Sequence, residues 1–266
     1  MQEIKLWRYY DLEKFLCFIN GEIYFARADK FKDKHEGSIP KRNFDAFIEW
    51  CSYAAKKSEI NPIKKLFQKK FEERKKKAAI SCWHISDNES VAMWEVYSKA
   101  RKGIAISTTL SKLERIKKPE NYKMEMFNVS YIDFNKEFSD EYFQYELLPF
   151  KNKRKEFSFE QEFRIMLYQE NPNIKPIEVA DFTPNKFPNT LEVIKYGFVS
   201  KLNDIPFEGV KLSVDPSEII DEILASPNMS NKEVNEIQLI LNSMNKDENT
   251  KYKIRRSKLY DKPDYG

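Results

Sequence analysis

Apolar residues recur every three or four positions in several parts of the chain, which is the spacing of a helix that buries one face. The longest such region covers residues 43–77, where Asn61 and Pro62 interrupt the pattern and predict a break between two helices. Residues 12–19 and 231–244 repeat the amphipathic pattern near the two ends of the chain. A further helix is expected at residues 137–148.

Short stretches rich in β-branched and aromatic residues predict strands between these helices. They cover residues 4–10, 22–26, 78–82, 103–109, 128–134, 160–168, 209–214 and 251–254. Strands and helices are interspersed without the regular alternation of a doubly wound sheet, so we predict an α+β fold with a central, mostly antiparallel twisted sheet and flanking helices. We expect one domain over residues 1–266, with a helical insertion at about 43–77 and a C-terminal helix and strand at about 231–260.

The most unusual pattern is KRKEFSFEQEFRIMLY, at residues 153–168. Read as a strand, it places Glu160, Glu162 and Arg164 on one face and Phe159 on the opposite apolar face. Charged groups on a strand face are costly to bury without partners. These side chains are therefore either solvated or part of a site.

Composition limits the class of protein. Aromatic residues make up 14% of the 266 residues, which is typical of a folded chain, and 46 basic against 42 acidic residues give a net charge of only +4. That balance does not indicate a dedicated nucleic-acid binder. Three cysteines without CxxC spacing, no apolar leader and no apolar run of about 18 residues favour a cytoplasmic location and no membrane partner.

Metal sites have weak support in the sequence. The two histidines, His35 and His84, lie on separate segments, so no zinc motif is formed and no metal is expected. A magnesium ion held by carboxylates alone is the alternative, and it would suit a metal-dependent nuclease. The carboxylates that could hold it are those of Asp33, Glu36, Glu160 and Glu162.

One order of motifs along the chain resembles a branch of the ADP-ribosyltransferase superfamily. It consists of an arginine, a hydroxyl pair and a Glu-x-Glu motif, at Arg8, Ser107, Thr108, Glu160 and Glu162. The resemblance implies that Arg8 binds a phosphate or ribose of NAD and that the hydroxyls brace the pocket. It implies a split sheet, and it implies that Glu162 stabilises the positive charge that develops as nicotinamide leaves, while Glu160 orients the acceptor.

The remaining residues of this predicted site are aromatic or lie in a loop. Tyr9, Tyr24 or Phe31 could stack on the nicotinamide ring, and the loop from Phe31 to Glu36 could act as a lid. The alternative is an ordinary structural role, in which Arg8 pairs with a surface carboxylate and the glutamates are solvated.

Several segments together resemble the bacterial domain of unknown function family number 2971. The segments include an aromatic-Arg-Tyr start, a Phe-Asp-Glu loop, a Cys-led strand, a Met-Trp helix and a Glu-x-Glu-x-Arg element. They lie at Trp7, Arg8, Tyr9, Phe31, Asp33, Glu36, Cys82, Trp83, His84, Met93, Trp94, Phe157, Glu160, Glu162, Arg164, Asp215 and Pro227. One departure is that Lys34 and His35 stand where the family has Asp-Pro. Members of this family are similar to phage-defence and abortive-infection proteins with a transferase-like core.

These features predict a toxin-like ADP-ribosyltransferase that consumes NAD and modifies a protein or nucleic-acid acceptor in anti-phage defence. A neutralising or sensor partner protein is expected with it. The alternatives are a non-catalytic binding or sensor module, whose basic run at residues 69–77 contacts a partner, and the metal-dependent nuclease.

Overall fold

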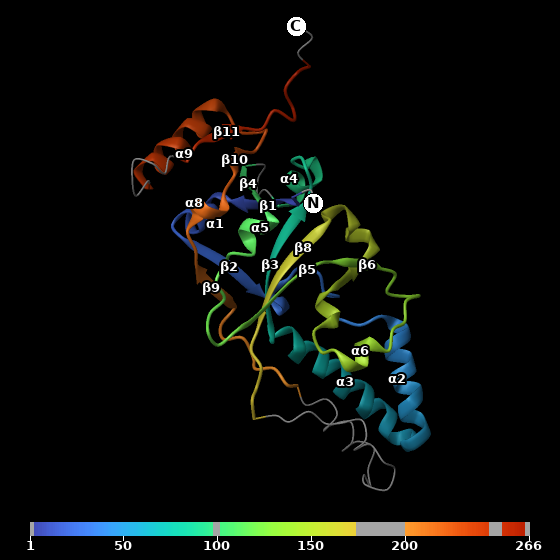
Figure 1. The fold of residues 1–266 in the computed structure, drawn as a ribbon. Helices are drawn as coiled ribbons and strands as arrows, with labels where there is room; N and C mark the ends of the chain where they lie inside the picture. Colours follow the sequence, from blue (N-terminus) through green and yellow to red (C-terminus); the bar gives the residue numbers. More distant parts are fainter. Residues whose placement is uncertain (1–2, 98–101, 174–199, 245–251, 264–266) are drawn as a thin grey trace.

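The computed structural model of the chain describes residues 3–97, 102–173, 200–244 and 252–263. Within them, a mixed and mostly antiparallel nine-stranded sheet forms the centre of the molecule, with helices around it (Figure 1). The sheet strands are β1 (Lys5–Asp11), β2 (Glu22–Arg27), β3 (Ala78–Ile85), β4 (Gly103–Thr109), β5 (Lys123–Asn128), β8 (Glu162–Tyr168), β9 (Gly209–Ser213), β10 (Glu222–Ala225) and β11 (Ile254–Arg256). The predicted α+β class is confirmed.

The long strand β3 organises the sheet. One of its edges pairs with β8 from Ala78 to His84. Its other edge pairs with β1 at the C-terminal end and with β2 at the N-terminal end, so β1 and β2 diverge along it. Beyond β1 the sheet continues through β4 and β10 to the parallel strand β11, and β5 pairs with the free edge of β8.

The two faces of the sheet carry different cores. The face that holds Leu6, Trp83 and Phe163 packs against α1 (Leu12–Ile19) and α9 (Asn231–Met244), and we call it the α1 face. The face that holds Trp7, His84 and Glu162 is called the α4 face, because Trp7 packs there against α4 (Val91–Tyr97). The register pairs Trp7 with His84 and His84 with Glu162, which places the three side chains on this one face.

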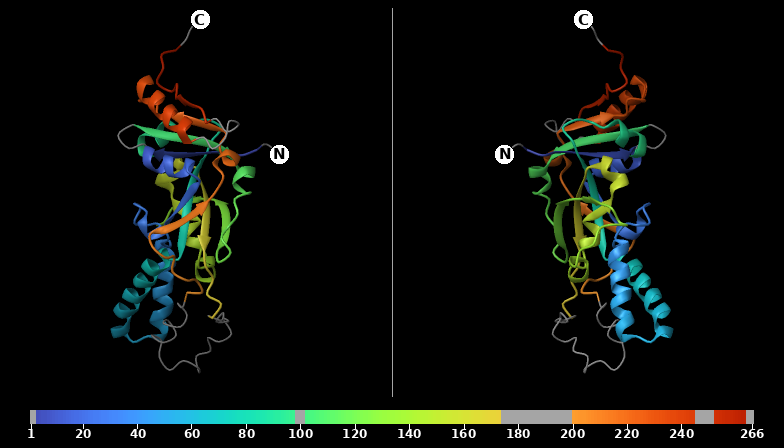
Figure 2. Two further views of the ribbon diagram at one scale, coloured as in Figure 1. Left: turned by 90° about the vertical axis from the view of Figure 1, so that its left-hand side faces the viewer. Right: turned by 90° about the vertical axis from the view of Figure 1, so that its right-hand side faces the viewer.

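The helices confirm the predicted pattern, with one correction. α2 (Lys41–Ala54) and α3 (Ile60–Lys75) occupy the predicted helical region, share their own core and lie side by side at one end of the sheet (Figure 2). The predicted break between the two helices exists, but it lies at residues 55–59 and not at Asn61 and Pro62. Pro62 lies in the first turn of α3, where a missing N–H removes no helical hydrogen bond. The shorter helices are α5 (Leu110–Leu113), α6 (Glu141–Gln144) and α8 (Pro216–Ile219).

The region between β5 and β8 differs most from the prediction. The predicted helix at residues 137–148 is reduced to the single turn of α6, followed by a 3-10 turn at Leu148–Phe150. The predicted strand at residues 128–134 is divided between the end of β5 and β6 (Ser130–Ile132), which pairs with β7 (Asn152–Arg154). In the described part of the chain, no helix has the length and apolar character needed to cross a membrane.

Candidate functional site

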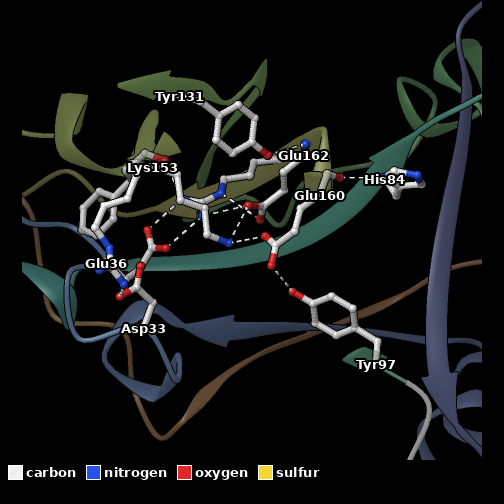
Figure 3. A network of polar contacts seen from close by, with 11 residues as sticks. Asp33, Glu36, His84, Tyr97, Tyr131, Lys153, Glu160 and Glu162 are labelled. Atoms are coloured by element: carbon white, nitrogen blue, oxygen red, sulfur yellow. Dashed lines mark hydrogen bonds and ion pairs between the residues drawn. The ribbon is translucent and has the colours of Figure 1, made fainter. Parts of the chain in front are cut away.

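The predicted Glu-x-Glu strand begins later than its sequence indicated. Residues Lys155–Glu160 form a short 3-10 helix after β7, and Gln161 then adopts a left-handed conformation with φ of 37°. The prediction that Glu160 belongs to the strand was therefore wrong, because the turn at Gln161 separates it from β8. The same turn directs the carboxylates of Glu160 and Glu162 toward one ammonium group, that of Lys153 (Figure 3).

Lys153 joins the two glutamates in a buried site. Its Nζ forms an ion pair with Glu160 and lies 3.2 Å from Oε2 of Glu162. Only 4% of Glu160 and 5% of Glu162 is exposed. The solvated alternative for the two glutamates was therefore wrong, and their burial requires partners.

Arg164 supplies the second cation. Its Nε and Nη2 lie 3.0 and 3.1 Å from the carboxylate of Glu162, which confirms that these side chains share a strand face. The guanidinium also binds Glu36 through two hydrogen bonds of 2.7 and 2.9 Å and the carbonyl oxygen of Phe150 at 2.6 Å. Arg164 is fully buried with its donors paired, which is the arrangement that burial of a guanidinium demands.

We call Glu36, Lys153, Glu160, Glu162 and Arg164 the carboxylate cluster. Its three carboxylates face two cations, so the cluster carries one surplus negative charge. Burial alone would raise the pKa of Glu162, but Arg164 and Lys153 outweigh it and lower that pKa to about 2. Burial would lower the pKa of Lys153, yet Glu162 and Glu160 raise it above the ordinary value. Both groups are therefore charged at neutral pH.

Three aromatic side chains border the carboxylate cluster (Figure 3). The hydroxyl of Tyr97, a side chain 42% exposed, donates a hydrogen bond of 2.8 Å to Oε1 of Glu160. The hydroxyl of Tyr131 accepts a hydrogen bond of 2.8 Å from the Glu162 amide. His84 Nδ1 lies 2.6 Å from the Glu160 carbonyl oxygen, and burial lowers the pKa of this imidazole, which favours its neutral form. Tyr97 thus connects the buried Glu160 with the surface.

The structure separates two predicted cofactor residues from this cluster. Arg8 and Thr108 lie on the α1 face, opposite to Glu162. Arg8 fills the gap between β1 and β2, where it donates hydrogen bonds of 2.6 Å to Ser81 and 3.0 Å to the carbonyl oxygen of Tyr24. Thr108 donates to the carbonyl oxygen of Ile219. The structure therefore does not bring Arg8 and Thr108 together with Glu162, because alternate residues of a strand point to opposite faces.

Other predicted residues lie on the α4 face or near the cluster. Tyr9 contacts Trp94 edge to face at 4.9 Å between ring centroids. Ser107 is buried beside Trp7, and its hydroxyl has no hydrogen-bond partner in the described part of the chain. The guanidinium carbon of Arg164 lies over the Phe31 ring, 5.9 Å from the ring centroid. Glu36 belongs to the carboxylate cluster. Tyr24 lies apart, on the outer strand pair of β2 and β9.

Sequence reasoning gave no role to Lys153, Tyr97 or Tyr131. The basic residues before Glu160 were the one available signal for Lys153, but a strand reading points it away from the glutamates. Only the 3-10 helix after β7 folds the chain back and brings Lys153 to them. Tyr97 and Tyr131 come from α4 and β6, and their sequence neighbours carry no sign of this contact.

The magnesium alternative is not favoured by the arrangement of its carboxylates. Asp33 pairs with Arg154 at 2.9 Å, and Glu36, Glu160 and Glu162 pair with Arg164 or Lys153. Among the described residues, no group of three or more His, Cys, Asp or Glu side chains is placed to hold a metal ion.

Comparison with known proteins finds that part of the chain matches one family. No curated protein and no solved structure matches the chain. The region that runs from α4 to β8 supplies most of the carboxylate cluster, namely Lys153, Glu160, Glu162 and Arg164. Residues 93–165, which include this part of the cluster, match the family described as Protein of unknown function (DUF2971).

Proposed function

We propose that the carboxylate cluster is the active centre of an enzyme that transfers ADP-ribose from NAD to a protein or nucleic-acid acceptor. The observation that supports this proposal is the surplus negative charge of a buried site that Tyr97 links to the surface. A fixed anion in surroundings of low polarity stabilises positive charge that appears only in a transition state. Glycosyl transfer from a nicotinamide ribose develops such a charge.

The ion pairs assign different roles to the two glutamates. Glu162 binds both Lys153 and Arg164, whereas Glu160 has Lys153 as its cationic partner, so the surplus charge is centred on Glu160. We therefore infer that Glu160 is the charge-stabilising carboxylate and that Glu162 positions it through Lys153. These roles are the reverse of those that the sequence resemblance implied.

The proposed reaction has three bond changes. The bond between C1′ of the ribose and the nicotinamide nitrogen breaks, and nicotinamide leaves with the electron pair. Positive charge then develops on C1′ and the ring oxygen, beside Glu160. A nucleophilic atom of the acceptor bonds to C1′ and releases its proton to the solvent. Glu162 takes no part in proton transfer, because a carboxyl group with a pKa of about 2 has no proton to donate at neutral pH and is too weak a base to hold one.

In this proposal NAD binds beside Glu160, where the exposed ring of Tyr97 is available to stack on nicotinamide or adenine. Tyr9 and Trp94 are buried against each other in the core of the same face and support it from below the surface. Arg8 has no place in this site, since its guanidinium lies on the α1 face.

The decisive experiment measures nicotinamide release and transfer of labelled ADP-ribose for the wild type and Glu160→Gln. We expect the variant to lose about 100-fold or more in rate, because the surplus charge is removed. Glu49→Gln is the matched control, an exposed carboxylate on α2. Circular dichroism checks that each variant is folded. A wild-type rate in folded Glu160→Gln, or no consumption of NAD by the wild type with cell extract as acceptor, overturns the proposal.

The complete pairing of Glu162 and Arg164 favours a second candidate function, a non-catalytic binding or sensor module. There the cluster only fixes the loop that carries Glu36 to β8. This candidate predicts that NAD is not consumed and that Glu160→Gln changes stability alone. On family resemblance, we propose for either function a role in anti-phage defence, with a neutralising or sensor partner protein.

A further inference from the structure

The helical hairpin formed by α2 and α3 holds the surplus positive charge of this protein. The two helices lie side by side and project beyond one end of the sheet (Figure 2). We call residues 50–70, which include the turn between the helices, the hairpin tip. It contains six basic residues and one acidic residue, a net charge of +5, whereas the other 245 residues contain 40 basic and 41 acidic residues. The net charge of +4 of the whole chain is therefore concentrated at this tip.

Four lysines of the hairpin tip have no carboxylate partner. They are Lys56, Lys57, Lys64 and Lys65, of which Lys64 is half-buried and the others are exposed. In the part of the chain that the structure describes, none of the four forms an ion pair. The basic run at residues 69–77 differs, because Glu72, Glu73 and Asp204 pair with four of its lysines. Like charges gathered at the tip repel one another, and a bound polyanion relieves that repulsion.

Two aromatic side chains in the last turns of α2 face the solvent. Trp50 is 55% exposed and Tyr53 is 82% exposed. Residues three positions apart are neighbours on the surface of a helix, so the two rings lie next to each other. The core of the hairpin is built by other residues, among them Phe47 and Phe67, whose rings stack at 4.3 Å between centroids. Packing therefore does not account for Trp50 and Tyr53.

We propose that the hairpin tip binds single-stranded nucleic acid, with bases stacked on Trp50 and Tyr53 and phosphates bound by Lys56 and Lys57. Aromatic rings beside a basic surface bind single strands of DNA or RNA without reading their sequence. A duplex is a poorer ligand, because its bases are already stacked on each other. A protein partner is disfavoured, because lysine is depleted at protein–protein interfaces. The proposal involves no residue of the carboxylate cluster and does not rest on the function proposed for it.

The positions of the tryptophans provide a readout of stacking. The chain has four tryptophans, all in described segments, and Trp7, Trp83 and Trp94 are at most 2% exposed. Trp50 is therefore the tryptophan on which a base can stack. A bound single strand should quench its fluorescence, whereas polyphosphate, which has the charge but no bases, should not.

The test titrates fluorescently labelled oligo(dT) and oligo(U) with the full chain and follows anisotropy. Duplex DNA of the same length, polyphosphate and phosphatidylserine vesicles serve as competitors. We expect the single strands to bind more tightly than any competitor and to quench the tryptophan fluorescence of the wild type. The tighter of the two strands identifies DNA or RNA as the preferred ligand.

Substitution of Trp50 tests the stacking contact. Trp50→Ala should weaken single-strand binding at least about fivefold, and Trp50→Phe, which keeps a ring, should retain most of the affinity. In Trp50→Phe the quenching by a bound strand should disappear, since the remaining tryptophans are buried. Phe207→Ala, at a ring that is 87% exposed outside the hairpin, is the matched control, and circular dichroism checks that each variant is folded.

Substitution of the lysines tests the phosphate contacts. For single strands, each contact contributes about 0.7 to the slope of log K against log salt concentration, so the double variant Lys56→Gln with Lys57→Gln should lower the slope by about 1.4. The double variant Lys117→Gln with Lys118→Gln, an adjacent and exposed pair outside the hairpin, is the matched control and should keep the wild-type slope.

Five results overturn the proposal. They are that neither single strand binds, that a competitor binds at least as tightly as the strands, that folded Trp50→Ala binds like the wild type, that quenching persists in Trp50→Phe, or that the double variant at Lys56 and Lys57 keeps the wild-type slope. The result for Trp50→Phe keeps the test valid if Trp50→Ala does not fold.

Discussion

Arg164 and Arg74 differ in how completely their guanidinium groups are hydrogen-bonded. Arg164 donates to Glu36, Glu162 and the carbonyl oxygen of Phe150. Arg74 packs on the Phe71 ring, and its buried Nη1 atom has no hydrogen-bond partner among the residues that the structure describes. The difference shows that burial of a charge does not by itself identify a site. A complete set of partners gives a structural anchor, whereas a buried donor without an acceptor destabilises the folded protein.

The largest expected effect comes from removing the satisfied guanidinium. Arg164→Met leaves the carboxylates of Glu36 and Glu162 buried without their main cation. Loss of one partner from a buried ion pair costs about 3–5 kcal/mol in the free energy of unfolding. Urea denaturation measures this change. Arg74→Met is the matched comparison, and an equal loss in both variants would break the distinction between the two arginines.

The next effect is a fall in the free energy of unfolding at acidic pH. The pKa of Glu162 is about 2 in the folded protein, against an ordinary value of 4.5. Because the folded-state pKa is lowered, the stabilisation is fully present above pH 4.5 and is lost as the pH falls toward 2. The shift corresponds to about 3 kcal/mol at neutral pH.

Chemical denaturation at a series of pH values between 2 and 6 measures this loss. Glu162→Gln is expected to show a smaller fall in unfolding free energy over the same range, since the titrating group is gone. Identical pH slopes for the wild type and this variant would show that Glu162 is not held ionised by its neighbours.

A smaller effect is expected at the edge of the carboxylate cluster. Tyr97→Phe removes the hydrogen bond to Glu160 but keeps the ring. A hydrogen bond to a charged group contributes about 1.5–3 kcal/mol when buried, and the partial exposure of Tyr97 places the expected loss near the lower value. Thermal denaturation detects it. Tyr53→Phe, at an exposed tyrosine of α2, should leave stability unchanged.

The smallest effect concerns the turn that brings the two glutamates together. Gln161 has φ of 37°, in the left-handed region that disfavours side chains. Gln161→Gly relieves this cost and should stabilise the protein by up to about 1 kcal/mol while the ion pairs of Lys153 persist. Denaturant midpoints compare the two proteins. A loss of stability would mean that contacts of the Gln161 side chain stabilise the fold by more than its left-handed backbone conformation destabilises it.

Much of the fold followed from periodicity, because helices and strands with a buried face repeat at fixed intervals. α1 and α9 were predicted with the bounds that the structure has, and β4 also agrees at both ends. β5 was missed because its sequence, KMEMFN, mixes charges with apolar residues on a half-buried strand at the edge of the sheet.

The site could be predicted less well, since it depends on contacts between distant segments. Glu162 and Arg164 share a strand face, so local spacing was sufficient to pair them. Arg8 was assigned to the same site from motif order alone, and motif order does not define the face on which a side chain lies. Lys153 contacts the glutamates only because the 3-10 helix turns the chain back, and no periodic pattern of residues predicts this helix.

The position of β3 has a consequence for the exchange of amide hydrogens with solvent. This strand is bonded to β8 on one edge and to β1 and β2 on the other. Ala79, Ile80 and His84 are paired on both edges, so their amides can exchange mainly when the whole sheet opens, as in the most protected elements of other proteins. Exchange rates for these three residues should report the global free energy of unfolding. They offer a label-free standard against which every variant described above can be ranked.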